Sequence, residues 1–387
     1  MRGGSPGAVQ GVAILGSTGS IGRSTLDVLR RQREHFRVVA LTAGRNRETL
    51  DAQIAEWQPA FAGVAEGTTE SSGTGRALPT GPGALVDAAT HPDVDIVVNA
   101  VVGAAGLDAT LAALLAGKRV ALANKESLVT AGELVAAAAR QGGGEIVPVD
   151  SEHSAVLQCI TGGQGDVSRL ILTASGGPFR EWPAERLAAA TVTEALQHPT
   201  WRMGSKITVD SATLANKALE IIEAHYLFGL PYDALDAVVH PQSVVHAFVE
   251  FCDGSVIAQM GFPSMELPIL YALTHPRRLP DAGVRRFDPV AAGPLTFEPL
   301  RADAFRAFHL GVSAGRAGGT APALFNAANE VANAAFLSGV IGFGRISDVI
   351  AAVLDTVPAG PALDVETVRA ADAAARAAAH ALLRFPC

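Results

Sequence analysis

The chain has 387 residues, of which 49% are hydrophobic and 18% charged, and its formal net charge is −8. These values predict a folded protein with room for two or three domains, and they exclude a disordered chain and a general nucleic-acid binder, which needs dense basic patches. The three cysteines have no CxxC spacing, the polar start lacks an apolar signal region, and no apolar stretch is long enough to span a bilayer, so we expect a cytoplasmic protein without a membrane segment.

The first elements predict a dinucleotide-binding unit. An apolar strand at 12–15 leads into the glycine-rich turn GSTGSIG at 16–22 and then a helix at 23–31. In this context the glycines let the backbone approach a pyrophosphate, which rests on the helix N-terminus. The next strand, 38–43, ends in Gly44-Arg45-Asn46, where an NAD site carries an acidic residue; Arg45 suits the 2′-phosphate of NADP. A solvated loop position for Arg45 remains an alternative.

Further apolar runs predict the rest of a parallel sheet. Strands are expected at 61–64, 95–102, 119–123 and 145–149, with helices at 107–116 and 128–140. Such near-continuous apolar strands are typical of parallel sheets covered on both faces. A Gly/Ser/Thr-rich stretch at 67–75 is predicted to be a flexible surface loop.

Polar residues follow the last of these strands. Asp150 and Glu152 lie two positions apart there, and both carboxylates can converge on one cation if the strand unwinds. Oxygen ligands favour Mg²⁺ or Mn²⁺ over zinc. Taken alone, the stretch also fits a polar turn that caps a helix.

A second stretch, 209–220, strengthens the metal interpretation. Helical spacing puts Asn216 and Glu220 on one face, with Lys217 one turn before Glu220. A third carboxylate, a lysine and an amide on one helical face suit a metal bound beside a phosphate.

The remainder predicts an α+β domain followed by helices. We expect helices at 155–160 and 211–228, a strand at 170–173, and strands at 237–240, 243–251 and 255–260 in an antiparallel sheet. The loop 176–204, with a short helix at 184–189, carries two Trp residues and Gly/Pro at its ends, which indicates a mobile lid; a disordered insertion is the alternative. The tail is Ala-rich, with helical periods at 321–337 and 346–357, and is interpreted as a packing domain.

The predicted fold class is therefore α/β with three parts. An N-terminal Rossmann-like parallel sheet occupies 9–150, and an α+β catalytic domain with the lid 176–204 occupies 151–280. A linker at 281–301 leads to a C-terminal helical domain at 302–387.

Several long motifs occur together and in order: GSTGSIG, AGRN, NKESLV, VDSEHSA, SGGPFR, HPTWRMG, KITVDSATLANKALE and HPQSVVH. From residue 12 to about 275 the chain thereby resembles the 1-deoxy-D-xylulose 5-phosphate reductoisomerase family, and the helical tail also fits. The resemblance implies an enzyme that converts 1-deoxy-D-xylulose 5-phosphate to 2-C-methyl-D-erythritol 4-phosphate with NADPH and a divalent metal, in non-mevalonate isoprenoid synthesis. It also implies a homodimer, for which strands near 244–260 offer an interface.

The resemblance further implies roles for individual residues. Asp150, Glu152 and Glu220 would hold the metal. The substrate phosphate would be received by Ser175, Ser211, Asn216 and Lys217, and the hydroxyl and carbonyl end by Lys125, Ser151 and His198. The NADPH site would be lined by Thr18, Gly19, Ser20, Ile21, Gly44, Arg45, Asn46, Asn124, Glu126 and Gly204, while Trp201 and Met203 would lie on the lid.

A metal held by the substrate's carbonyl and neighbouring hydroxyl would polarise the carbonyl, either in carbon–carbon cleavage and rejoining or in a direct ketol shift. His153 follows the two ligands directly and suits a supporting or proton-handling role. His240 and His246 lie on or beside strands, where burial in the core is the favoured interpretation.

Two rival functions remain open at this point. A two-domain NADP-dependent dehydrogenase acting on a semialdehyde would share the first domain, but it would not need three carboxylates beside a phosphate site. A non-enzymatic NADP-sensing regulator would keep the glycine-rich turn and have no use for Asp150, Glu152 and Glu220 together.

Overall fold

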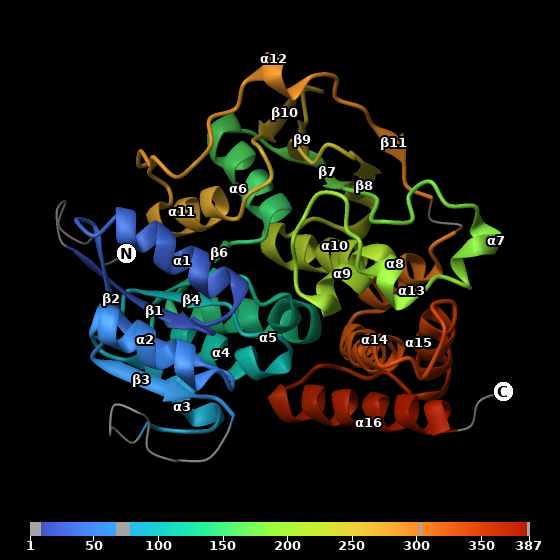
Figure 1. Cartoon of the computed structure of the whole chain (residues 1–387), viewed down its shortest axis with the longest axis horizontal. Helices are drawn as coiled ribbons and strands as arrows, with labels where there is room; N and C mark the ends of the chain where they lie inside the picture. Colours follow the sequence, from blue (N-terminus) through green and yellow to red (C-terminus); the bar gives the residue numbers. More distant parts are fainter. Residues whose placement is uncertain (1–8, 67–77, 302–303, 385–387) are drawn as a thin grey trace. The chain divides into compact units, whose positions relative to one another are not determined.

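The structure is a computed structural model and describes residues 9–66, 78–301 and 304–384 (Figure 1). Contacts divide the chain into two compact units, each assembled from separate parts of the sequence. The first comprises Met1–Ser127, Val135–Leu157 and Ser264–Arg286, and the second comprises Leu128–Leu134, Gln158–Pro263 and Phe287–Cys387. The division into three consecutive domains expected from the sequence stays a prediction.

The first unit contains a parallel sheet of six strands in the order β3-β2-β1-β4-β5-β6. The strands are β1 (Gln10–Leu15), β2 (Phe36–Ala43), β3 (Phe61–Val64), β4 (Ile96–Asn99), β5 (Arg119–Leu122) and β6 (Glu145–Pro148). The predicted parallel sheet is thereby confirmed. Its strand order reverses between β1 and β4, which is where doubly wound sheets bind nucleotides.

One predicted strand is too long. The run 95–102 forms a strand only over Ile96–Asn99, and the side chain of Asn99 then bonds to the chain that follows it. Its Nδ2 donates to Gly106 O at 3.0 Å and to Thr110 Oγ1 at 2.8 Å, and its Oδ1 accepts from Val101 N at 3.2 Å.

Helices follow the strands of this sheet. They are α1 (Ser20–Arg31), α2 (Arg47–Trp57), α3 (Pro82–Thr90), η1 (Ala104–Gly106), α4 (Leu107–Leu115), α5 (Lys125–Gly142) and α6 (Ser151–Gly163). A later helix, α11 (Glu266–Thr274), belongs to the same unit, because Ile269, Leu270 and Leu273 join the sheet's buried core. This return of the chain is not apparent from the sequence.

The second unit contains a five-stranded sheet in the order β10-β9-β7-β8-β11. The strands are β7 (Val167–Ala174), β8 (Leu235–Val239), β9 (Val245–Phe251), β10 (Val256–Met260) and β11 (Glu298–Pro299). The expectation of an antiparallel sheet is wrong in one pairing, because β7 and β8 run parallel. The helices between them form a crossover, which is long enough to return the chain to the same end of the sheet.

The helices of this unit include four long ones near the C-terminus, in the region where the sequence predicts a helical domain with two helical periods. They are α7 (Ala184–Leu187), α8 (Val192–Ala195), α9 (Ser205–Ala212), α10 (Ala215–Phe228), η2 (Tyr232–Ala234), α12 (Pro289–Ala292), α13 (Arg306–Ala317), α14 (Ala321–Leu337), α15 (Arg345–Thr356) and α16 (Val365–Arg384). The helix predicted at 211–228 is in fact two helices. The chain breaks at Leu214, whose φ of 59° lies in the left-handed region.

The predicted lid segment 176–204 is not uniform. Phe179, Leu187 and Ala195 are buried in the same hydrophobic core as α14 and α15, and Trp182 packs against that core. The first two-thirds of this segment are therefore anchored to the helical core by a few buried side chains, and its role as a lid stays a prediction. The stretch 197–204, between α8 and α9, consists of exposed and half-buried residues.

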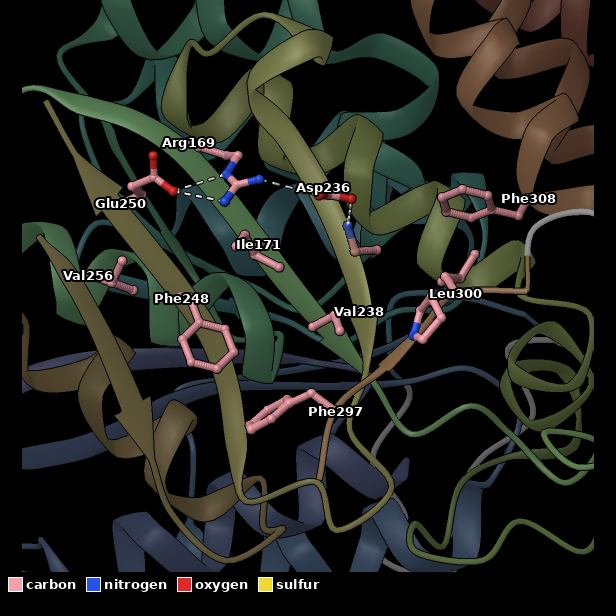
Figure 2. Close-up of a pocket in the computed structure, with 12 residues that line it drawn as sticks. Arg169, Ile171, Asp236, Val238, Phe248, Glu250, Val256, Phe297, Leu300 and Phe308 are labelled. Atoms are coloured by element: carbon pink, nitrogen blue, oxygen red, sulfur yellow. Dashed lines mark hydrogen bonds and ion pairs between the residues drawn. The ribbon is translucent and has the colours of Figure 1, made fainter. Parts of the chain in front are cut away.

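The five-stranded sheet has one open face. Leu170, Leu172 and Val249 point into the core and are fully buried, whereas the alternate residues of the same strands line a cavity of about 590 Å³ (Figure 2). Apolar side chains line most of this cavity, and three charged side chains lie at one part of it (Arg169, Asp236 and Glu250). The full lining is Arg169, Ile171, Asp236, Ala237, Val238, Phe248, Glu250, Val256, Phe297, Pro299, Leu300 and Phe308.

Across the described ranges, none of the helices has both the length and the apolar character needed to cross a membrane. The cytoplasmic location expected above stays a prediction, and the loop expected at 67–75 lies outside the described residues.

Candidate active site

The glycine-rich turn after β1 has the geometry of a nucleotide-binding turn. Gly16 has a φ of 81°, a conformation that favours glycine. A Cβ atom at Gly22 would lie 2.5 Å from the Cα of Ser17, so α1 can start this close to the turn only with glycine there. Gly19 caps α1 without any side-chain hydrogen bond, which leaves the first N–H groups of the helix to a ligand.

The end of β2 presents a basic side chain. The side chain of Arg45 is 85% exposed and pairs with Glu66. Asn46 is engaged differently, because its Oδ1 caps α2 by accepting from Thr49 N at 3.0 Å. Of the residues predicted at this strand end, Arg45 is therefore the one whose charge is available to a phosphate.

Asn124 and Glu126, also predicted for the cofactor site, are buried. Asn124 Nδ2 donates to Val101 O at 2.7 Å and to Gly103 O at 2.8 Å, and its Oδ1 accepts from Ser127 N at 3.0 Å. Asn124 thus caps α5 and holds the loop after β4, at the reversal point of the sheet.

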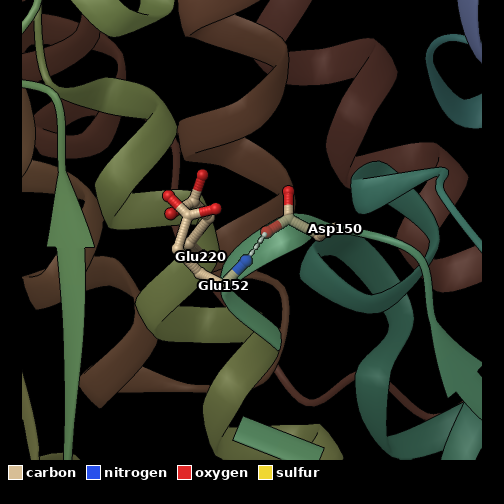
Figure 3. A group of neighbouring side chains, drawn as sticks. All are labelled: Asp150, Glu152 and Glu220. Atoms are coloured by element: carbon tan, nitrogen blue, oxygen red, sulfur yellow. Dashed lines mark hydrogen bonds between the residues drawn. The ribbon is translucent and has the colours of Figure 1, made fainter. Parts of the chain in front are cut away.

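The predicted metal ligands come together. Asp150 follows β6, Glu152 lies in the first turn of α6, and Glu220 lies on α10. Each offers a carboxylate oxygen, and the three oxygens lie within 4.8 Å of one another (Figure 3). The strand ends at Pro148, before Asp150, and α6 starts at Ser151, so the two carboxylates converge at the start of a helix; Asp150 Oδ1 accepts from Glu152 N at 3.2 Å.

Two lysines lie against this group. Lys125 Nζ contacts Asp150, and Lys217 Nζ contacts Glu220 and donates to Thr173 O at 2.5 Å. Lys217 and Glu220 are almost fully buried, and the charge of Lys217 offsets the desolvation of the Glu220 carboxylate, as Lys125 does for Asp150. The donor set contains carboxylate oxygens only, which fits Mg²⁺ or Mn²⁺.

A polar cluster lies within the second unit, at the end of β7. His198 Nε2 is 3.0 Å from Ser175 Oγ and 3.2 Å from Ser211 Oγ. On the other side of the ring, Nδ1 accepts the backbone N–H groups of Thr200 and Trp201, at 3.2 and 2.9 Å. Burial lowers the pKa of His198, which keeps the ring neutral near pH 7. Because Nδ1 is an acceptor, the proton of the neutral ring lies on Nε2, where it can be donated.

The break between α9 and α10 completes this cluster. Leu214 turns the chain between the end of α9 and the start of α10. Ser211 thereby lies in the last turn of α9, and Asn216 lies in the first turn of α10. The N-cap residue Leu214 makes no side-chain cap, and Ala215 N donates to Thr213 Oγ1 at 3.3 Å. The positive end of the α10 dipole lies at this turn, where it favours an anion. Asn216 contacts Glu220 through its Nδ2.

The remaining predicted residues are less engaged. Ser151 Oγ contacts Glu152, and His153 is fully buried with its Nδ1 3.6 Å from Asp150 Oδ1. The rings of Trp201 and His246 lie 6.4 Å apart. The other predicted residues show no polar side-chain contact that bears on a role: Thr18, Ser20, Ile21, Gly44, Met203 and Gly204.

The favoured interpretation of His240 and His246 is confirmed as far as burial is concerned. His240 is fully buried, donates from Nδ1 to Thr296 O at 2.8 Å and stacks on Phe297 with ring centroids 4.6 Å apart. His246 is 7% exposed.

The sequence interpretation missed one group of residues behind the site. Asp210, on α9, is buried and bonded to Asn329 and Asn333 of α14. The available signal was the spacing of Asn326, Asn329 and Asn333, which puts three amides on one face of an alanine-rich helix.

A nucleotide-binding parallel sheet combined with an oxygen-ligand metal group defines a class, the metal-dependent oxidoreductases that use a dinucleotide. Three family models narrow it: 1-deoxy-D-xylulose 5-phosphate reductoisomerase matches residues 12–132, and two C-terminal domains of the same enzyme match 146–228 and 260–378. A 1-deoxy-D-xylulose 5-phosphate reductoisomerase from Ralstonia nicotianae is 49% identical over 97% of this chain and 98% of that protein, and one from Heliobacterium modesticaldum is 49% identical over 95% and 96%. The chain belongs to the 1-deoxy-D-xylulose 5-phosphate reductoisomerase family.

Solved structures agree with this assignment. The reductoisomerase from Zymomonas mobilis in complex with NADPH has a TM-score of 0.89 and 41% identity, over 98% of this chain and 100% of that one. A DOX-P reductoisomerase in complex with NADPH, fosmidomycin and magnesium also has a TM-score of 0.89, with 38% identity over 97% and 98% of the two chains. The predicted family and fold class are thereby confirmed.

Proposed function

We propose that the chain converts 1-deoxy-D-xylulose 5-phosphate to 2-C-methyl-D-erythritol 4-phosphate, a step of non-mevalonate isoprenoid synthesis, with NADPH as reductant and Mg²⁺ or Mn²⁺ as metal. The observation that carries this proposal is the group of Asp150, Glu152 and Glu220 in a chain of this family. A semialdehyde dehydrogenase or an NADP-sensing regulator would have no use for three carboxylates gathered in this way.

The three carboxylates would hold the divalent ion, which when bound supplies Lewis acidity at the substrate's carbonyl and neighbouring hydroxyl. Lys125 Nζ, which contacts Asp150, would supply a positive charge and hydrogen bonds beside these oxygens. Ser151 and His153 flank Glu152 in α6; Ser151 would contact the substrate and His153 would support Asp150 or carry a proton.

We propose that the substrate phosphate binds at Ser175, Ser211, Asn216 and Lys217, as the sequence predicts. We add His198, which the sequence had assigned to the hydroxyl and carbonyl end, because its ring lies between the two serine hydroxyls. This proposal is supported by a donating Nε2–H on a neutral histidine, two hydroxyls within 3.2 Å of it, and the positive end of the α10 dipole, where Asn216 and Lys217 lie in the first turn. These donors are fixed by the fold, so a phosphate would gain several hydrogen bonds at little ordering cost.

NADPH would bind along the turn after β1 and the end of β2. Thr18, Gly19, Ser20 and Ile21 would face the pyrophosphate at the start of α1, and Gly44, Arg45 and Asn46 would lie at the 2′-phosphate. Asn124, Glu126 and Gly204 complete the proposed set. The bound cofactor supplies the hydride, while these residues determine its position and its preference for the phosphorylated form.

Trp201 and Met203 would cover the reacting sugar. They lie in the stretch 197–204, and His198 links this stretch to the phosphate cluster through the backbone N–H of Trp201. Binding of phosphate at His198 would therefore order the stretch, which excludes water from the reaction.

The test of the function is NADPH oxidation, followed by absorbance, with substrate and metal added separately and together. We expect oxidation only when both the ketose phosphate and Mg²⁺ or Mn²⁺ are present, with 2-C-methyl-D-erythritol 4-phosphate as the product identified by NMR. Oxidation without metal, or with an unphosphorylated semialdehyde in place of the ketose phosphate, would contradict the proposal.

We also infer that the chain forms a homodimer through the open face of the five-stranded sheet. Val256 and Phe297, which line the cavity on that face, are 52% and 44% exposed. Apolar side chains around a hollow on a sheet face are typical of a surface that a second copy covers.

A further inference from the structure

Asp210 is a buried carboxylate that the proposed chemistry does not use. It lies on α9, its side chain is 1% exposed, and it is surrounded by groups that donate hydrogen bonds. Asn329 Nδ2 donates to its Oδ1 at 2.7 Å, Asn333 Nδ2 donates to the same oxygen at 2.9 Å, and Lys206 Nζ lies 3.0 Å from Oδ2. A buried carboxylate needs such partners, because an uncompensated charge in the interior is strongly unfavourable.

The amides come from the C-terminal helical region. Asn329 and Asn333 lie on one face of α14, and both are fully buried in a helix that is otherwise rich in alanine. Asn333 Nδ2 also donates to Lys206 O at 3.1 Å. The two amides therefore contact both the first turn of α9, at Lys206, and its last turn, at Asp210.

The residue after Asp210 is Ser211, whose hydroxyl belongs to the proposed phosphate cluster. The carbonyl of Ser211 is closely packed as well, since a Cβ atom at Gly177 would lie 2.8 Å from its oxygen. Any shift of α9 along or about its axis would move Ser211 Oγ relative to Ser175 and His198. It would also move the start of α10, because only Thr213 and Leu214 separate the two helices.

We propose that Asp210, Asn329 and Asn333 are positioning residues that hold α9 so that the phosphate cluster is formed before the substrate arrives. The inference deepens the proposed function and rests on it. A phosphate bound by several donors at once is sensitive to displacements of a few tenths of an ångström, so fixing one helix from behind raises affinity without any contact to the ligand. The C-terminal helices thereby contribute to substrate recognition and do more than pack.

The chain offers a matched control. Asn326 lies on α14 and is as buried as Asn329, but its Nδ2 is 3.3 Å from Glu330, on α14 itself, and it does not contact Asp210. Asn326→Ala and Asn329→Ala remove the same atoms from the same helix. A role that is only structural predicts the same kinetic effect for both.

The experiment measures two constants for each variant, in the presence of NADPH and Mg²⁺: the KM for 1-deoxy-D-xylulose 5-phosphate and the competitive inhibition constant of 1-deoxy-D-xylulose, which lacks the phosphate. For Asp210→Asn and Asn329→Ala we expect the KM to rise at least tenfold while the inhibition constant of the unphosphorylated sugar stays within threefold. Asn326→Ala should leave both constants unchanged even if its Tm falls.

Two further variants keep the test decisive if Asp210→Asn does not fold. One is Asn333→Ala, and the other is a double variant, the exchange that combines Asp210→Asn with Asn329→Asp. Asn333→Ala leaves Asn329 and Lys206 on the carboxylate, and we expect a smaller rise in KM of the same kind. The exchange reverses donor and acceptor, so it should recover part of the lost affinity. Parallel changes of both constants in the Asp210, Asn329 and Asn333 variants, or no change in either, would overturn the inference. A wild-type enzyme that does not turn over the ketose phosphate would instead defeat the proposed function.

Discussion

His198 Nε2 lies 3.0 Å from Ser175 Oγ, so a side chain of the loop before α9 is held at the end of β7. The same ring accepts two backbone N–H groups through Nδ1, one of them from Trp201. Protonation of the ring would turn Nδ1 into a donor facing these N–H groups. The neutral ring is therefore a condition for the observed loop conformation as well as for phosphate binding in the proposed site.

This relationship predicts a loss of stability in mild acid. Burial lowers the pKa of His198 below its usual value of 6.5, so the unfolded state takes up the proton first as pH falls. The stabilisation by the neutral ring is complete above about pH 6.5 and is lost as the pH decreases through the lower pKa of the folded state. Between pH 7.5 and 5 the Tm of wild type should therefore fall more than that of His198→Asn, which cannot titrate. His309→Asn, at an exposed histidine, is the matched control and should follow the wild type; equal slopes for all three proteins would contradict the prediction.

The metal proposal predicts separate effects at its ligands. Asp150→Asn should reduce turnover by about two decades or more at limiting Mg²⁺, because the ion loses a charged ligand and with it part of its Lewis acid effect. NADPH binding, followed by its fluorescence, should persist. Asp166→Asn, at an exposed aspartate, should behave as wild type. Near wild-type turnover of Asp150→Asn at limiting metal would exclude this ligand assignment.

Glu220→Gln should lose turnover in the same way but should also lower the Tm. In this variant the buried ammonium group of Lys217, which is 4% exposed, would have lost the carboxylate of Glu220 as its partner. Removing one partner of a buried ion pair lowers the free energy of unfolding by about 3–5 kcal/mol.

The sequence predicts those parts of the site whose position is determined by neighbouring residues in the chain. Asp150 directly follows an apolar strand, and the spacing of Asn216 and Glu220 places both on one helical face, so neighbouring residues suffice. The helix break at Leu214 has no such signal, because a left-handed residue is usually Gly or Asn and a leucine gives no indication of it. The contact of Asp210 with Asn329 joins residues 119 positions apart, and nothing near either residue specifies the partner.

Arg45 should set the cofactor preference. Its charge lies at the end of β2 and is paired only at the surface, with Glu66. Replacing Arg45 by Asp should raise the NADPH dissociation constant by about tenfold, or ~1.4 kcal/mol, because an exposed charge-assisted contact to the 2′-phosphate is lost and a repulsion is added. NADH affinity should change much less. Glu66→Gln frees Arg45 and should leave NADPH binding equal or tighter; an unchanged NADPH/NADH preference in Arg45→Asp would assign the 2′-phosphate contact to another residue.

Proteolysis should distinguish the two parts of the segment 176–204. Arg180 pairs with Glu298, and Arg186, although exposed, lies 3.5 Å from the ring of Trp182, which packs against the helical core. Arg202 is exposed in the stretch 197–204, so trypsin should cleave the ligand-free protein there first. NADPH, Mg²⁺ and a phosphonate substrate analogue should together slow this cut, and Arg202→Gln should remove it. Trp201→Ala should keep cofactor and metal binding but lose turnover. First cleavage at Arg180 or Arg186, or equal rates of cleavage with and without ligands, would contradict the prediction that the stretch 197–204 is the mobile part that the ligands order.

The open sheet face should decide the oligomeric state. Val256 lies on β10, is 52% exposed and lines the cavity of about 590 Å³ beside Phe248 and Phe297. A glutamate at this position would place a desolvated charge in an interface covered by a second copy, and twofold symmetry would place that charge in the interface twice. Val256→Glu should therefore shift the protein from dimer toward monomer in sedimentation equilibrium, with a concentration-dependent mass between the two. Val340→Glu is the matched control, because Val340 is 62% exposed and lies outside the cavity lining; it should sediment as wild type. A wild-type monomer at all concentrations, or a Val256→Glu dimer as tight as wild type, would show that this face is not the interface.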